Sequence, residues 1–131
     1  MKNLESKFAS YQHSLALKDL GFREKCLGWY LPEIVEKGNI SSVALGACLS
    51  DWTKFGDRLS APLKSQVFEF FRDDYGYDVT IKKITKDKYQ FLIELLFVED
   101  SEYHFVDYYF ESYNEAESKC IDKLLEIVNR K

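Results

Sequence analysis

The chain has 131 residues, 46% of them hydrophobic and 16% aromatic, which is enough for one domain with a sizeable core. The formal net charge is -4, from 18 Lys and Arg against 22 Asp and Glu, which excludes a surface that attracts nucleic acid over its whole area. No apolar run reaches the roughly 18 residues of a membrane span, and the first residues lack the apolar core of a signal peptide. We therefore expect a single cytoplasmic domain over residues 1–131, with no membrane segment.

The first predicted element is a helix near the N-terminus, capped by Asn3 and ended by Gly21. Its apolar side chains recur at helical spacing at Leu4, Phe8, Tyr11 and Leu15. Residues 26–31 then predict a short strand, because they are apolar and aromatic and are followed by Pro32, which cannot continue a sheet ladder.

Residues 33–59 carry the weakest pattern. Gly38 and Asn39 indicate a turn, and the apolar run 43–49 predicts a second, buried strand. The same run also fits a short helix capped by Ser41 or Ser42, and the sequence leaves this alternative open. Trp52 and Phe55 follow in a polar loop.

A second helix is predicted from Ser60 to Tyr75, with Ser60 as its cap and Pro62 tolerated in the first turn. Its apolar face consists of Leu63, Val67, Phe70, Phe71 and Tyr75. Gly76 ends it, and apolar and polar residues then alternate over 77–82, as in a half-buried strand.

Two further strands and a last helix complete the pattern. Residues 85–88 predict a tight turn into a central strand over 89–97, and an acidic turn at 99–102 leads to a third strand over 105–111. The last helix, 112–131, opens on Ser112 and Glu115, which have the spacing of a capping box. We expect five side chains at the centres of the apolar stripes to be nearly fully buried: Phe71, Phe91, Ile93, Leu124 and Ile127.

These elements predict an α+β fold with an antiparallel sheet of three to five strands and helices packed on one face. The C-terminal part, from Ser60 onward, has the order α-β-β-β-α, preceded by an N-terminal helix and a short strand or hairpin. Double-stranded-RNA-binding domains have this order, and so do several unrelated folds, so the order alone does not decide function.

Three motifs carry a family resemblance. The first is residues 17–22 with Cys26 and Tyr30; the second is Ala61-Pro62-Leu63 with Gln66, Phe68, Phe71, Arg72 and Tyr75; the third is residues 113–117 with Cys120 and residues 124–128. Together they resemble a group of small uncharacterised proteins of phages, prophages and mobile elements of Bacteroidetes-type gut bacteria. The resemblance implies a mobile-element context and no particular activity.

No residue pattern predicts catalysis, a metal or a cofactor. Cys26, Cys48 and Cys120 stand far apart without a C-x-x-C spacing, so we interpret them as small buried hydrophobes in a reducing compartment. His13 and His104 have no nucleophile motif nearby. The acidic runs lack the alternating ligands of a calcium loop. We expect no catalytic residue, no metal site and no cofactor.

Two groups of residues remain as candidate contact sites. The aromatic residues exceed what the core stripes need, and four of them are candidate protein contacts: Trp52, Phe55, Tyr103 and Tyr109. For Trp29 a core position is the favoured interpretation. The predicted hairpin is basic, and its lysines are candidate nucleic-acid contacts: Lys82, Lys83, Lys86 and Lys88.

The acidic run 99–117 decides between these two sites, because it would border the same sheet and repel a phosphate backbone. We therefore expect a non-catalytic protein-interaction or accessory module of a phage or mobile element. Its partner is another protein, and its oligomeric state is left open. The alternative is a nucleic-acid-binding module that uses the Lys82–Lys88 hairpin.

Overall fold

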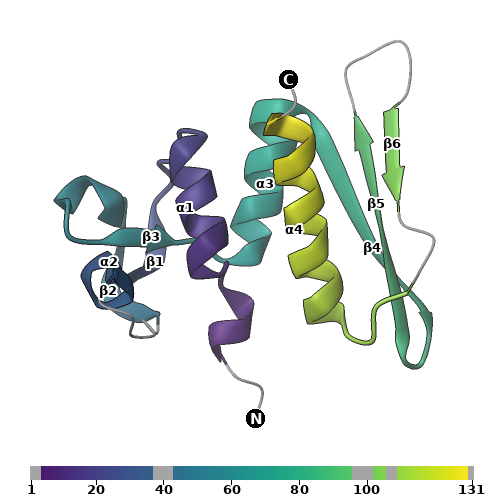
Figure 1. The fold of residues 1–131 in the computed structure, drawn as a ribbon, viewed down its shortest axis with the longest axis horizontal. Coiled ribbons are helices and arrows are strands. Elements are labelled where there is room, and N and C mark those ends of the chain that lie inside the picture. Colours follow the sequence, from purple (N-terminus) through teal and green to yellow (C-terminus); the bar gives the residue numbers. More distant parts are fainter. Residues whose placement is uncertain (1–3, 37–42, 96–101, 106–108, 130–131) are drawn as a thin grey trace. The chain divides into compact units, whose positions relative to one another are not determined.

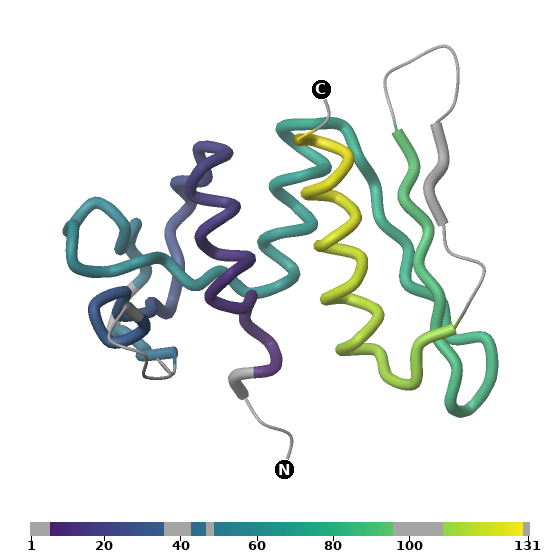
Figure 2. Tube along the Cα trace, in the orientation of Figure 1, coloured from purple at the N-terminus to yellow at the C-terminus, as the bar shows by residue number. Residues whose placement is uncertain are grey.

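The computed structural model describes residues 4–36, 43–95, 102–105 and 109–129 (Figures 1 and 2). The protein is α+β, as predicted, with antiparallel sheets and four α-helices in the described part. Its chain divides into two compact units, Met1–Gln66 and Val67–Lys131. A single domain over 1–131 stays a prediction.

The first unit contains a three-stranded antiparallel sheet in the order β2-β1-β3. Along the chain its elements are the 3-10 helix η1 (Leu4–Lys7), α1 (Tyr11–Asp19), β1 (Cys26–Tyr30), α2 (Pro32–Glu36), β2 (Ala44–Ser50), the 3-10 helix η2 (Trp52–Phe55) and β3 (Leu59–Ala61). Residues 43–49 thus contribute to a strand, one of the two predicted alternatives, but Leu45 and Leu49 on it are exposed. The predicted turn at Gly38 and Asn39 lies outside the described residues.

The first helix starts later than its apolar spacing predicted. Asn3 does not cap it; instead Ser10 is the N-cap, with its Oγ accepting the His13 backbone N–H at 3.1 Å. The predicted end is confirmed, since Gly21 has φ of 88° and its N–H donates to the Lys18 carbonyl. The Phe22 N–H donates to the Leu17 carbonyl, which completes a Schellman motif.

The core of the first unit lies on one face of this sheet. It consists of Phe8, Tyr30, Leu59 and Ala61, with Tyr11, Leu15, Val43 and Leu63 packed at its edge. Tyr30 is fixed in it by an Oη–H that donates to the Ala9 carbonyl at 2.6 Å. Gly28 faces this core, and a Cβ there would lie 2.7 Å from Val43 Cγ1, so β1 needs a glycine at this position.

The prediction that Ser60 caps the second helix is wrong. Ser60 lies in β3, where it pairs with Trp29, and α3 (Lys64–Tyr75) begins only after Pro62. The Gln66 side chain caps the start of α3 instead of Ser60. Its Oε1 accepts the Leu63 N–H, as in half of a capping box, and its Nε2 donates to the Lys25 carbonyl; both bonds measure 2.9 Å.

The second unit contains a three-stranded antiparallel sheet of β4 (Tyr77–Thr85), β5 (Lys88–Leu95) and β6 (Glu102–Phe105). The central position of β5 was predicted correctly, and the turn lies at Lys86 and Asp87. The third strand was placed too late: it starts at Glu102, and 106–108 lie outside the described residues. Phe110 pairs with Tyr89 as an isolated bridge.

The last helix, α4 (Tyr113–Asn129), packs on β5 and β4 of this sheet (Figure 1). Ser112 caps it as predicted, with its Oγ accepting the Glu115 N–H at 3.1 Å. The core prediction is also confirmed. The residues concerned, all at most 3% exposed, are Phe71, Phe91, Ile93, Leu124 and Ile127.

One expectation about the sheet is wrong. The N-terminal strands were expected to extend the sheet of the C-terminal part, but β1, β2 and β3 pair only with one another, so the described chain has two sheets. The reason is β3, because this short strand pairs with β1 and completes a separate sheet in the first unit.

Candidate functional site

An arginine stacked among three aromatic rings is the most distinctive surface feature of the first unit. We call Trp29, Trp52, Phe55 and Arg58 the arginine–aromatic cluster. Trp29 lies on β1, Trp52 and Phe55 lie on η2, and Arg58 directly precedes β3. Because side chains alternate along a strand, Trp29 points to the opposite sheet face from Gly28 and Tyr30, which face the core.

The rings and the guanidinium group are in direct contact. The Arg58 Cζ lies 4.7 Å from the ring centroid of Trp29, 5.3 Å from that of Trp52 and 5.7 Å from that of Phe55. The two indoles are 4.4 Å apart, and the Trp52 and Phe55 rings are 5.9 Å apart. These distances are within the range of cation–π attraction, so the rings hold the arginine in place.

Hydrogen bonds fix η2 over the sheet and thereby fix the cluster. The Trp52 Nε1–H donates to the Cys26 carbonyl at 2.7 Å. Thr53 and Ser60 exchange two bonds: the Thr53 N–H donates to Ser60 Oγ, and the Ser60 N–H donates to Thr53 Oγ1. Gly46 on β2 lies directly beneath the indoles, since a Cβ there would be 2.5 Å from the Trp52 ring.

Only part of the cluster reaches solvent. Phe55 is 53% exposed and the Arg58 side chain is 34% exposed, whereas Trp52 is 8% exposed. The expectation that Trp52 is an exposed contact is therefore wrong, because its indole N–H is satisfied inside the unit and its ring supports Arg58. Lys54 adds a second positive charge, with its Nζ 5.3 Å from the Phe55 ring centroid.

The basic hairpin of the second unit forms a separate candidate surface. All four predicted lysines are exposed: Lys82, Lys83, Lys86 and Lys88. Two of them contact tyrosine rings, Lys83 over Tyr89 at 5.8 Å and Lys88 over Tyr109 at 5.3 Å. Tyr109, one of the candidate protein contacts, is 46% exposed. Tyr103 lies on β6 opposite Glu94, and its side chain is outside the described set.

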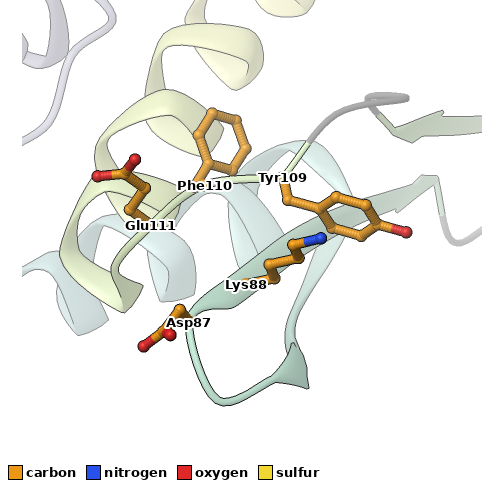
Figure 3. Close-up of a pocket in the computed structure, with 5 residues that line it drawn as sticks. All are labelled: Asp87, Lys88, Tyr109, Phe110 and Glu111. Atoms are coloured by element: carbon orange, nitrogen blue, oxygen red, sulfur yellow. The ribbon is translucent and has the colours of Figure 1, made fainter.

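A pocket of about 680 Å³ lies beside this hairpin. It is lined by Asp87, Lys88, Tyr109, Phe110 and Glu111, and Figure 3 shows Lys88 reaching toward the Tyr109 ring. Asp87 and Glu111 contribute two carboxylates to its lining. The pocket is therefore mixed in charge, which suits neither a phosphate backbone nor a single strong anion.

The two cysteines whose side chains are described are buried and poorly reactive. Burial raises the pKa of Cys26 to about 12; the nearby Asp51 and Glu24 carboxylates act in the same direction, against a hydrogen bond with Ser60. Burial also raises the pKa of Cys120 strongly. A raised pKa disfavours the thiolate, which is the reactive form of cysteine, near neutral pH. Among residues whose positions are described, no group of His, Cys, Asp and Glu could hold a metal ion.

Comparison with protein-family models, curated proteins and solved structures finds no match to this chain. Of the helices in the described ranges, none has the length and hydropathy to cross a membrane.

Sequence reasoning missed Arg58 and assigned Trp29 to the core. The surplus of aromatic residues was a usable signal, but Trp29 and Trp52 are far apart in sequence. They meet because β3 pairs with β1 and η2 folds over both, and neither β3 nor η2 was predicted.

Proposed function

We propose that this chain is a non-catalytic protein-interaction module and that the arginine–aromatic cluster is its contact surface. The observation that carries the proposal is an exposed Phe55 and a half-buried Arg58 supported on two fixed indoles. Aromatic residues and arginine dominate the binding energy of protein interfaces, especially where neighbouring groups already exclude water. A cytoplasmic role as an accessory protein of a phage or mobile element, which the motif resemblance implies, is part of this proposal.

The rigidity of the cluster supports this function. Binding costs less when contact side chains are already ordered, because little rotamer entropy is lost on association. Trp52 is held by its bond to the Cys26 carbonyl, and Arg58 by stacking on Trp29 and Trp52. Exposed single apolar residues are normal on protein surfaces, but an arginine fixed among three rings is a preformed anchor.

The test is capture of partners by the full chain from native host cells, with bound proteins and nucleic acids both identified. A variant with Phe55→Ala and Arg58→Ala should lose a specific protein that the wild type retains. The matched control is Tyr113→Ala, since Tyr113 is 49% exposed but lies in the second unit. The captured protein, once purified, should bind the double variant at least about tenfold more weakly. If the double variant binds the captured protein as tightly as the wild type and the Tyr113→Ala control do, the proposal is contradicted.

A second candidate function, nucleic-acid binding, is supported by the basic hairpin. Its lysines are exposed, and two of them lie against tyrosines, an arrangement in which bases can stack on rings near positive charge. The α-β-β-β-α order expected from the sequence, which double-stranded-RNA-binding domains share, belongs to this candidate function as well. Against it, the last helix of those domains opens with basic residues, whereas α4 opens with Glu115 in its first turn.

A further inference from the structure

We propose that Arg58 receives the carboxylate of an acidic side chain on the partner protein, while Phe55 contacts an apolar side chain next to it. This inference rests on the proposed function and names the partner's chemistry: a surface segment in which an Asp or Glu adjoins an aromatic or aliphatic residue.

The Arg58 guanidinium has hydrogen-bond donors that the described part of the chain does not use. Its only polar contact within the described part of the chain is between Nε and the Asp57 Oδ1, at 3.9 Å. That distance is too long for a hydrogen bond. The terminal N–H groups therefore have no acceptor among the described residues, although the side chain is only 34% exposed. A guanidinium with several unused donors, held partly out of water, is prepared to bind an anion.

The geometry of the cluster leaves the Arg58 fork available to a ligand. Trp29, Trp52 and Phe55 lie within stacking distance of the guanidinium, so Arg58 uses its contacts with the rings for attachment and keeps its hydrogen-bonding fork for a ligand. A planar carboxylate matches that fork with two parallel hydrogen bonds. Because the rings restrict the side chain before binding, the ligand gains this contact at reduced entropic cost.

The charges around the cluster favour a single carboxylate as the ligand. A cationic ligand is disfavoured because Arg58 already occupies the place among the rings that a ligand cation would take. A phosphate backbone is disfavoured more than a single carboxylate, because it would bring several negative charges past the Asp57 carboxylate, which stands beside Arg58 and is 75% exposed. One carboxylate next to an apolar group fits best, since Phe55 adds exposed apolar area and Lys54 adds a second positive charge.

The cluster contains its own reporter. The chain has two tryptophans, and both belong to the cluster, so intrinsic tryptophan emission reports on this site without a label. The probes are random short peptides displayed on a carrier and selected on the full chain, followed by synthesis of the enriched peptides. We expect an enriched pattern of Asp or Glu beside Phe, Tyr, Leu or Ile, and saturable change of the emission on titration.

The variants separate charge from geometry. Arg58→Gln removes the charge and the fork, while Arg58→Lys keeps the charge but loses the planar fork and the stacking. Both should weaken peptide binding at least about tenfold, and an Asp→Asn or Glu→Gln change in the peptide should cause a loss that is not additive with Arg58→Gln. The matched control is Arg72→Lys, at an exposed arginine that pairs with Asp73 in the second unit. It should bind like the wild type.

The other possible outcomes distinguish failure of the carboxylate inference from failure of the proposed function. Selection of basic peptides, selection of no peptide, or acidic peptides whose binding is unchanged by Arg58→Gln overturns the carboxylate inference. If enriched peptides depend on Phe55 but not on Arg58, the interaction surface stands and only the partner chemistry is wrong. If partner capture is also insensitive to the double variant, the proposed function fails as well.

Discussion

Gly46 controls the space beneath the two indoles of the arginine–aromatic cluster. Alanine normally costs nothing relative to glycine in a strand, because glycine loses more backbone entropy on folding. At Gly46 we expect alanine to destabilise the protein instead, since a Cβ there would lie 2.5 Å from the Trp52 ring and 3.0 Å from the Trp29 ring. The ring system can relieve this contact only by moving away from the sheet.

We predict that Gly46→Ala destabilises the protein by about 1–3 kcal/mol, as for other overpacked sites, and shifts the tryptophan emission. Guanidinium unfolding followed by fluorescence measures both effects. The control is Leu45→Ala on the same strand, which should change stability by less than about 0.5 kcal/mol because Leu45 is 47% exposed. A stabilised Gly46→Ala protein would show that the indoles do not rest on β2.

Leu124 tests the core of the second unit. It is 0% exposed in the middle of the buried stripe of α4, so Leu124→Ala should lower the free energy of unfolding by about 2–5 kcal/mol. Denaturant titration gives the value, with Lys119→Ala on the exposed side of the same helix as the control. A loss below about 0.5 kcal/mol would mean that α4 does not pack as described.

Cys26 provides a test by pH. Burial raises its pKa in the folded protein to about 12, above the 9.0 of an exposed thiol, so the unfolded chain loses this proton first as the pH rises. The thiol's contribution to stability is complete below pH 9 and is lost progressively toward pH 12. The slope should be at most about 1.4 kcal/mol per pH unit for one thiol. Unfolding titrations of wild type and Cys26→Ala should diverge in slope over that window, and parallel curves would contradict the burial of this thiol.

At the scale of elements, strong local patterns were predictable and short paired strands were not. The last helix has the residue spacing of a capping box and a long apolar stripe, and the hairpin of β4 and β5 alternates apolar and polar residues, so both were recognised. Leu59–Ala61 has no such pattern, and its strand conformation depends on pairing with β1. Locally, Ser60 before Pro62 looks like a helix start, and this resemblance produced the wrong assignment.

The parts of the candidate site that depend on non-local pairing were not predictable either. Phe55, which the sequence places in a polar loop, is 53% exposed, because bulky residues in polar segments often reach the surface. The role of Arg58 depends on β1, η2 and β3 coming together through non-local strand pairing. Residue spacing in the sequence does not predict such pairing. Trp52 sits in a polar segment yet is buried, because η2 folds back and its indole donates to the Cys26 carbonyl.

The hairpin between β4 and β5 separates the two candidate functions. We predict that replacing Lys82, Lys83, Lys86 and Lys88 together with Gln leaves folding and partner capture unchanged. Affinity of the wild type for duplex RNA or DNA should be no better than the non-specific range of about 10⁻⁴–10⁻⁶ M at physiological salt. Asp87 and Glu111 support this expectation, since both line the pocket beside Lys88.

Fluorescence anisotropy over a series of salt concentrations measures that affinity. The rival function requires sub-micromolar binding with a log–log salt slope of about -3 to -4, if each lysine meets one phosphate. It also requires that the Gln variant loses this binding. Those results together would replace the protein-interaction proposal with nucleic-acid binding.

At the scale of the whole molecule, the boundary between the two compact units falls inside α3. Residues 64–66 of that helix belong to the first unit and 67–75 to the second. A helix forms cooperatively, so its two ends are not expected to unfold independently. A chain of this length also usually unfolds in one step.

We therefore predict coincident unfolding of the two units in denaturant. Tryptophan emission follows the first unit, which holds Trp29 and Trp52, while far-ultraviolet circular dichroism follows helices of both. The two midpoints should agree within error. A fluorescence transition that clearly precedes the dichroism transition would show that the units unfold separately and would remove support for a single domain.

The Gln66 side chain makes the start of α3 sensitive to the difference between an amide and an acid. Glutamine and glutamate are nearly equal as helix formers, and either can accept a hydrogen bond at this helix position. Here, however, one end of the side chain accepts from Leu63 while the other donates to the Lys25 carbonyl. An ionised carboxylate has no proton to donate. Its second oxygen would face the Lys25 carbonyl oxygen, and the two negatively charged oxygens would repel each other. A single-base change of codon, or slow hydrolysis of the amide, would thus turn an attraction between distant segments into a repulsion without altering the shape of the side chain.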